Sequence, residues 1–104
     1  RASELTIACF GLAFKPNIDD LRESPAMEIA AQIARWHSGT TQVVEPNIHA
    51  LPKKLDGLCT LATLDAALAS ADVLVMLVDH NEFKAVSGDS VTQAYIIDTK
   101  GVWR

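Results

Sequence analysis

Residues 5–36, LTIACFGLAFKPNIDDLRESPAMEIAAQIARW, carry the clearest strand and helix signals of this 104-residue chain. The first part, Leu5–Phe10, is apolar on both faces, which is typical of a central strand in a parallel sheet. Ser24 and Pro25 then favour the start of a helix, because serine caps backbone N–H groups and proline fits the first helical position. The next apolar side chains recur at helical spacing, at Ile29, Ile33 and Trp36, with Ala26, Ala30 and Ala34 beside them. We therefore predict a strand, a long connection and a helix.

Outward from this unit, strand patterns continue to alternate with helical ones. We predict further strands at Thr41–Val44, Val73–Val78 and Tyr95–Asp98, and a short edge strand at Leu58–Leu61. Thr63 is expected to cap a small helix over Leu64–Ala69, and a weak helix should follow a loop at Asp79–Phe83. Right-handed crossovers in this order predict an α/β fold, a Rossmann-like three-layer domain whose mainly parallel sheet has the strand order 3-2-1-4-5.

The composition is that of one globular domain. Hydrophobic residues make up 49% of the chain and charged residues 21%. Nine basic and thirteen acidic residues give a net charge of −4, which argues against nucleic acid or an anionic membrane as the main partner. The longest apolar stretch, Val73–Val78, is far shorter than the roughly 20 residues of a membrane span. Because a strand begins almost at residue 1, we read residues 1–104 as a single domain excised from a longer protein.

Cysteine and histidine residues do not form a recognisable metal or nucleophile pattern. Cys9 and Cys59 lack CxxC spacing and have no neighbouring His, Lys or Arg to favour a thiolate, so we predict two reduced, non-catalytic thiols. His37, His49 and His80 lack the spacing of metal ligands. His37 is expected to play a structural role at a helix end. His80 lies on the predicted ligand-binding edge and is a minor candidate for a role in the site.

The connection after the first strand is the most informative segment for function. Residues 14–23 exceed the roughly 2–6 residues usual for such a connection, and ligands of these sheets bind beyond the carboxyl ends of the strands. Lys15 and Lys100 follow two different strands onto that edge, beside the helix start at Ser24. Two cations and a helix N-terminus suit a diphosphate. From spacing alone, the alternative of two surface lysines and a salt-bridged loop stays open.

Two other nucleotide or phosphate folds fit less well. The residues after the first strand are Gly11, Leu12, Ala13 and Phe14, so the GxGxxG dinucleotide fingerprint is absent from the sequence, as is a P-loop. A phospho-receiver domain would need an acidic pair, a phospho-accepting Asp and a Lys, which Asp19/Asp20, Asp79 and Lys100 could imitate. That match is poor, because the acidic pair lies far beyond the strand and Asp79 follows the fourth strand.

Four motifs together resemble a known family. GLAFKPNIDDLRESPA (11–26), VVEPN (43–47), ADVLVMLVDHNEF (71–83) and IIDTKGVW (96–103) resemble the C-terminal, UDP-binding domain of the UDP-glucose/GDP-mannose dehydrogenases, over essentially the whole chain. The resemblance implies a cytoplasmic, NAD-dependent oxidoreductase that converts the C6 alcohol of a UDP-sugar into a carboxylate with two NAD+. It also implies a homodimer or larger oligomer, with the NAD-binding domain, a middle dimerisation region and the catalytic Cys all upstream of this chain.

The resemblance also assigns roles to individual residues. It implies that Phe14, Lys15 and Lys100 contact the UDP-sugar and that Arg22 reaches NAD across a domain cleft. It implies no catalytic residue and no metal in this chain, which alone should be inactive. Two alternatives stay open: a dehydrogenase of another UDP-sugar such as UDP-glucose, and a non-catalytic interaction domain that binds no nucleotide.

Overall fold

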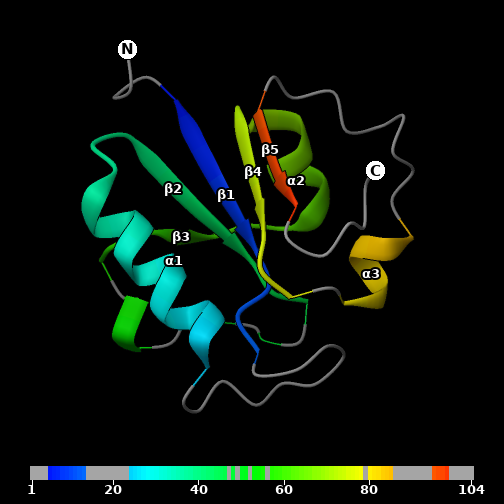
Figure 1. The fold of residues 1–104 in the computed structure, drawn as a ribbon, viewed down its shortest axis with the longest axis horizontal. Coiled ribbons are helices and arrows are strands. Elements are labelled where there is room, and N and C mark those ends of the chain that lie inside the picture. The colour runs from blue at the N-terminus through cyan, green and yellow to red at the C-terminus, as the bar shows by residue number, and fades with distance from the viewer. Residues whose placement is uncertain are drawn as a thin grey trace.

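The fold is a parallel sheet with helices on both faces (Figure 1). In this computed structural model, the described residues are 5–13, 24–46, 48, 50–51, 53–55, 57–78, 80–85 and 95–98. The sheet has the order β3-β2-β1-β4-β5, and each neighbouring pair is parallel. Its strands are β1 (Thr6–Phe10), β2 (Thr40–Val44), β3 (Thr60–Leu61), β4 (Val73–Met76) and β5 (Tyr95–Asp98). The predicted fold class and strand order are therefore confirmed.

Helices α1 and α2 begin where the capping signals place them. Helix α1 (Pro25–Trp36) has Ser24 as its cap, whose Oγ accepts a hydrogen bond from the Met27 N–H at 3.3 Å. Helix α2 (Leu64–Ser70) has Thr63 as its cap, whose Oγ1 accepts from the Ala66 N–H at 3.2 Å. A 3₁₀ turn, η2, spans Lys53–Leu55, and α3 spans Asn81–Lys84.

Strand β1 lies at the centre of the sheet and feeds two hydrophobic clusters. Ala8 and Phe10 face the cluster that includes Ala67 of α2, whereas Ile7 and Cys9 face the cluster that includes residues of α1. Figure 1 shows α1 and α2 on opposite faces of the sheet. Successive residues of a strand point to opposite faces, so a strand covered on both sides needs the continuous apolar run that the sequence has.

Helix α1 buries only part of the predicted apolar stripe. Ala26, Met27, Ala30 and Ala31 are the buried residues, Ile33 is partly buried, and Ile29 and Trp36 are 43% and 78% exposed. The expected stripe of Ile29, Ile33 and Trp36 was therefore wrong at both ends. The three alanines leave the buried face of the helix nearly flat, and Met27 supplies the larger apolar side chain of that face.

The carboxyl end of β4 also departs from the prediction. The strand ends at Met76 rather than Val78, because the N–H groups of Leu77 and Val78 both donate to the Phe10 carbonyl, at 2.9 and 3.1 Å. Helix α3 then begins at Asn81, inside the segment expected to be a loop. Its buried Phe83 packs edge-on against Phe10, with ring centroids 5.3 Å apart. This contact holds α3 against the sheet and explains why the helix begins earlier than predicted.

None of the helices within the described ranges has the length and apolar content that crossing a bilayer would require.

Candidate functional site

The carboxyl ends of β1 and β4 meet closely at Gly11. Gly11 has a φ of +99°, and its N–H donates to the Val44 carbonyl at 2.8 Å. A Cβ added there would lie 2.5 Å from the Val78 Cβ, which is closer than any packed side chain allows. Glycine is therefore required on both conformational and steric grounds. Because Gly11 has no side chain, the backbone that leaves β1 can pass close to Val78, which follows β4.

Glu45 joins the ends of three strands through one oxygen. Its Oε1 accepts hydrogen bonds from the backbone N–H groups of Leu12 at 2.8 Å and Ala13 at 3.1 Å, and it lies 2.8 Å from the His80 Nε2. Glu45 follows β2, Leu12 and Ala13 follow β1, and His80 follows β4. Because the Glu45 Oε1 already accepts from two backbone N–H groups, it is also the acceptor toward a His80 tautomer that carries hydrogen on Nε2. Glu45 is 3% exposed and His80 is fully buried.

Ser24 completes this arrangement from the start of α1. Its buried hydroxyl donates to the Leu12 carbonyl at 2.6 Å, in addition to capping the helix. Leu12 therefore has its N–H bound by Glu45 and its C=O bound by Ser24. The two residues that flank the long connection, Ala13 and Ser24, are held at one point of the sheet edge.

The position of Glu45 would suit a dinucleotide, but its contacts do not. In dinucleotide-binding sheets an acidic residue after the second strand accepts hydrogen bonds from a ribose hydroxyl. Glu45 occupies that place in the chain, yet its carboxylate is buried and turned toward Leu12, Ala13 and His80. Together with the sequence GLAF in place of a glycine fingerprint, this geometry does not suit NAD binding in the usual Rossmann manner.

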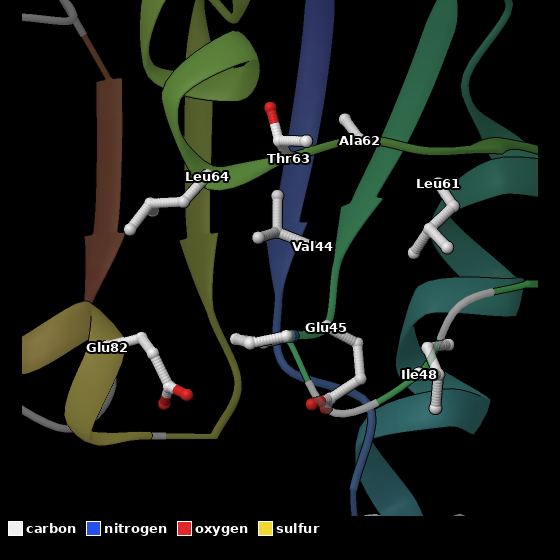
Figure 2. A pocket seen from close by; sticks show the side chains of 9 residues that line it. Val44, Glu45, Ile48, Leu61, Ala62, Thr63, Leu64 and Glu82 are labelled. Carbon is white, nitrogen blue, oxygen red and sulfur yellow. The ribbon is translucent and has the colours of Figure 1, made fainter.

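A cleft of about 460 Å³ lies beside Glu45, on the side of α2 (Figure 2). Glu45 at the end of β2 and Glu82 of α3 are among its lining residues, although the Glu45 carboxylate itself is turned away toward the backbone and His80. No Lys or Arg is among the described lining residues. The remainder of the lining is Val44, Pro46, Ile48, Leu61, Ala62, Thr63 and Leu64. Negative charge repels a diphosphate, so this cleft is a poor place for one.

The residues predicted to bind ligands, Phe14, Lys15, Arg22 and Lys100, lie outside the described residues, as do Asp19, Asp20, Asp79 and His49. The structure does place the residues next to them in the sequence. Ala13 follows β1, Ser24 precedes α1, and Asp98 ends β5. Because β1 and β5 both run parallel to β4, the carboxyl ends of all three strands lie at the same edge of the sheet.

Cys9, Cys59 and His37 have contacts that are typical of residues that stabilise the fold. Burial raises the pKa of the Cys9 thiol to about 12, with a further increase from the negative charge of a Cys59 thiolate. Burial also raises the pKa of Cys59, and both residues are free thiols. The His37 Nε2 lies 2.8 Å from the Leu5 carbonyl, at the amino edge of the sheet, which agrees with its predicted structural role. Within the part of the chain that the structure describes, no group of three metal-ligating side chains occurs.

The network of Leu12, Ser24, Glu45 and His80 is the feature that sequence reasoning missed. Two local signals pointed to it: a carboxylate directly after the buried strand β2, and an imidazole shortly after β4. Neither signal indicates its partner, because Glu45 and His80 are 35 positions apart in the sequence.

Comparisons with known proteins agree with the fold. Residues 8–104 match the UDP-glucose/GDP-mannose dehydrogenase family, UDP binding domain. Over 104 residues the chain is 82% identical to the UDP-N-acetyl-D-mannosamine dehydrogenase of Salmonella typhi and 79% identical to that of Escherichia coli strain K12. Both alignments include the whole chain but 25% of each relative, so the chain spans about a quarter of their length.

Solved structures lead to the same family. A UDP-D-ManNAc dehydrogenase from Pyrococcus horikoshii aligns over 99% of this chain and 23% of its own, with a TM-score of 0.75 and 28% identity. The UDP-N-acetyl-mannosamine dehydrogenase of Staphylococcus aureus aligns over 96% of this chain and 23% of its own, with a TM-score of 0.68 and 26% identity. The chain therefore belongs to the UDP-glucose/GDP-mannose dehydrogenase family, as its UDP binding domain.

Proposed function

We propose that this chain is the UDP-binding domain of an NAD-dependent UDP-N-acetyl-D-mannosamine 6-dehydrogenase. The observation that carries the proposal is the 79–82% identity, along the entire chain, to proteins of that activity. Such an enzyme removes two hydrides in turn from C6, one to each of two NAD+, and adds water, so that the alcohol becomes a carboxylate. The product, UDP-N-acetyl-D-mannosaminuronate, serves bacterial surface polysaccharide synthesis of the enterobacterial common antigen type.

The chemistry of oxidation belongs, in this proposal, to other parts of a longer protein. A catalytic Cys must form a thiolate, and burial raises the pKa of both cysteines in this chain, that of Cys9 to about 12. The inward-turned carboxylate of Glu45 supports the view that an N-terminal domain binds most of the NAD. A middle region would supply the sugar pocket and the contacts of a dimer or larger oligomer.

The role of this chain is to hold the UDP end of the substrate. Phe14 and Lys15 follow Ala13 directly in the sequence, and Lys100 follows Asp98 by two positions. Ala13 and Asp98 both lie at the carboxyl edge of the sheet, where α1 also begins. Lysine ammonium groups offset the charge of a diphosphate, and helix N-terminal N–H groups favour an anion. Arg22, two positions before Ser24 in the sequence, is proposed to reach NAD across the cleft between domains.

A chimera tests this function directly. The corresponding segment of the Escherichia coli relative is replaced by this chain, and NADH formation is followed with UDP-N-acetyl-D-mannosamine and with UDP-glucose. We expect two NADH per molecule of UDP-N-acetyl-D-mannosamine and a much lower kcat/KM for UDP-glucose. A chimera that melts cooperatively and binds NAD, yet does not oxidise UDP-N-acetyl-D-mannosamine, would contradict the proposal.

A further inference from the structure

Glu45 and His80 form a buried acid–imidazole pair whose presence stability alone does not explain. The Glu45 Oε1 and His80 Nε2 are 2.8 Å apart, and both side chains are fully buried. The His80 ring packs edge-on to Phe83, with centroids 5.4 Å apart, so an apolar ring covers one side of the pair. Burying two ionisable groups costs solvation, and well-packed apolar side chains of similar volume often serve stability equally well.

The backbone contacts of Glu45 suggest what the pair does. Leu12 and Ala13 are the first residues after Gly11 at the end of β1, and their successive N–H groups converge on the same carboxylate oxygen. Successive backbone N–H groups of this kind form an anion-binding concavity, which many nucleotide sites use for phosphate. Here the chain's own carboxylate fills the concavity. The N–H groups of Leu12 and Ala13 are therefore committed to an internal anion.

We propose that Glu45 and His80 are positioning residues for nucleotide-sugar binding. Glu45 fixes the direction in which the backbone leaves β1 at Leu12 and Ala13, directly ahead of Phe14 and Lys15. His80 holds the carboxylate in place and ties it to the residues after β4. This inference rests on the proposed function, because it assigns to the pair the placement of the proposed UDP-binding residues. A displacement of about 1 Å in a binding group is enough to lower a rate or an affinity by a large factor.

Two histidines of this chain make a matched experiment in the full-length chimera. His80 and His37 are both buried, and each has its Nε2 bonded to an oxygen at 2.8 Å, but at opposite edges of the sheet. We expect His80→Ala to raise the KM for the UDP-sugar about tenfold, with a smaller change in kcat. His37→Ala should leave that KM within about twofold, although both variants lose stability.

Conservative variants separate positioning from folding. A glutamine at position 80 places an amide N–H where Nε2–H lies, so His80→Gln should restore the KM to within about threefold of the parent. Glu45→Gln keeps an acceptor for the two backbone N–H groups but removes the charge, and we expect a KM increase of about threefold. Both variants approximately retain the volume of the buried side chain. Their KM values therefore test the positioning role even if His80→Ala does not fold.

The results distinguish this inference from the proposed function. One outcome would overturn the positioning role and leave the proposed site intact. In that outcome Lys15→Ala raises the KM, whereas the KM is unchanged in all three variants of the pair, His80→Ala, His80→Gln and Glu45→Gln. An equal rise in KM for His37→Ala and His80→Ala would also overturn the positioning role, because the effect would then follow stability. If Lys15→Ala leaves the KM unchanged, the proposed binding residues are wrong, whatever the pair does.

Discussion

The Ser24 hydroxyl donates to the Leu12 carbonyl at 2.6 Å, so the chain leaving β1 and the chain entering α1 are joined at one point. The same oxygen caps α1 by accepting from the Met27 N–H. Residues 14–23 connect these two segments of chain, so the residues just before and just after this connection are held in place. In related folds, binding residues are commonly carried by loops that a rigid scaffold holds in this manner.

Ser24→Ala should be more costly than the loss of a cap alone. It removes the α1 cap and leaves the buried Leu12 carbonyl without its hydroxyl donor, so we expect a loss of about 1–3 kcal/mol in the free energy of unfolding. Thr63→Ala is the matched control, because the Thr63 side chain is exposed and caps only α2. Urea denaturation of both variants checks the order, and equal losses would contradict it.

Gly11→Ala should be strongly destabilising, whereas Gly57→Ala should cost less. Both glycines have positive φ, +99° and +78°, which costs an alanine about 1–2 kcal/mol. At Gly11 the new Cβ also meets Val78 at 2.5 Å, whereas nothing lies within 4 Å at Gly57. Overpacking adds about 1–3 kcal/mol at Gly11. Chemical denaturation measures the difference, and similar losses at both positions would show that the approach of Val78 is not tight.

Cys9 should make the stability of the chain depend on alkaline pH. Its folded pKa is about 12, above its ordinary value of 9.0, because burial disfavours the thiolate. Between these values the folded state retains a proton that the unfolded state has lost, so stability falls as pH rises from 9 toward 12. The slope contributed by one proton is about 1.4 kcal/mol per pH unit. Cys9→Ala should remove this part of the slope in denaturation curves recorded from pH 8 to 11, and an unchanged slope would contradict burial of the thiol.

Lys15 and Arg22 should affect different ligands in the full-length chimera. Lys15→Ala is expected to raise the KM for the UDP-sugar by the loss of a charge-assisted contact, on the order of 1.5–3 kcal/mol, or roughly 10- to 150-fold. Arg22→Ala should act mainly on the KM for NAD+. Lys53→Ala, at an exposed position on η2, is the control for a change of charge and should alter neither constant. Steady-state kinetics with each ligand varied in turn show whether the two effects separate.

Local sequence patterns predicted the strands and the starts of α1 and α2 because those features depend on neighbours in the chain. The apolar run of β1 and the capping residues Ser24 and Thr63 are signals of this kind. The buried face of α1 was mispredicted in part, because the large side chains of Ile29 and Trp36 were expected to be buried along with the alanines beside them. Trp36 lies near the end of the helix with 78% of its surface exposed, while small alanines face the sheet.

The contacts at the carboxyl edge could not be predicted in the same way. Glu45 and His80 meet only because β2 and β4 flank β1, so their pairing is a product of the strand order. A sequence shows that a carboxylate and an imidazole each follow a strand. It does not show that the carboxylate turns inward to the Leu12 and Ala13 N–H groups instead of outward to a ligand.

UDP is proposed to bind at the carboxyl edge of the sheet, near Ala13 and Asp98, and a titration of the ¹⁵N-labelled chain with UDP measures this binding. We predict saturable chemical-shift changes at residues 14–24 and 99–101. Changes centred on the cleft beside Glu45, at Thr63, Leu64 and Glu82, or no changes at millimolar UDP, would contradict this placement of UDP.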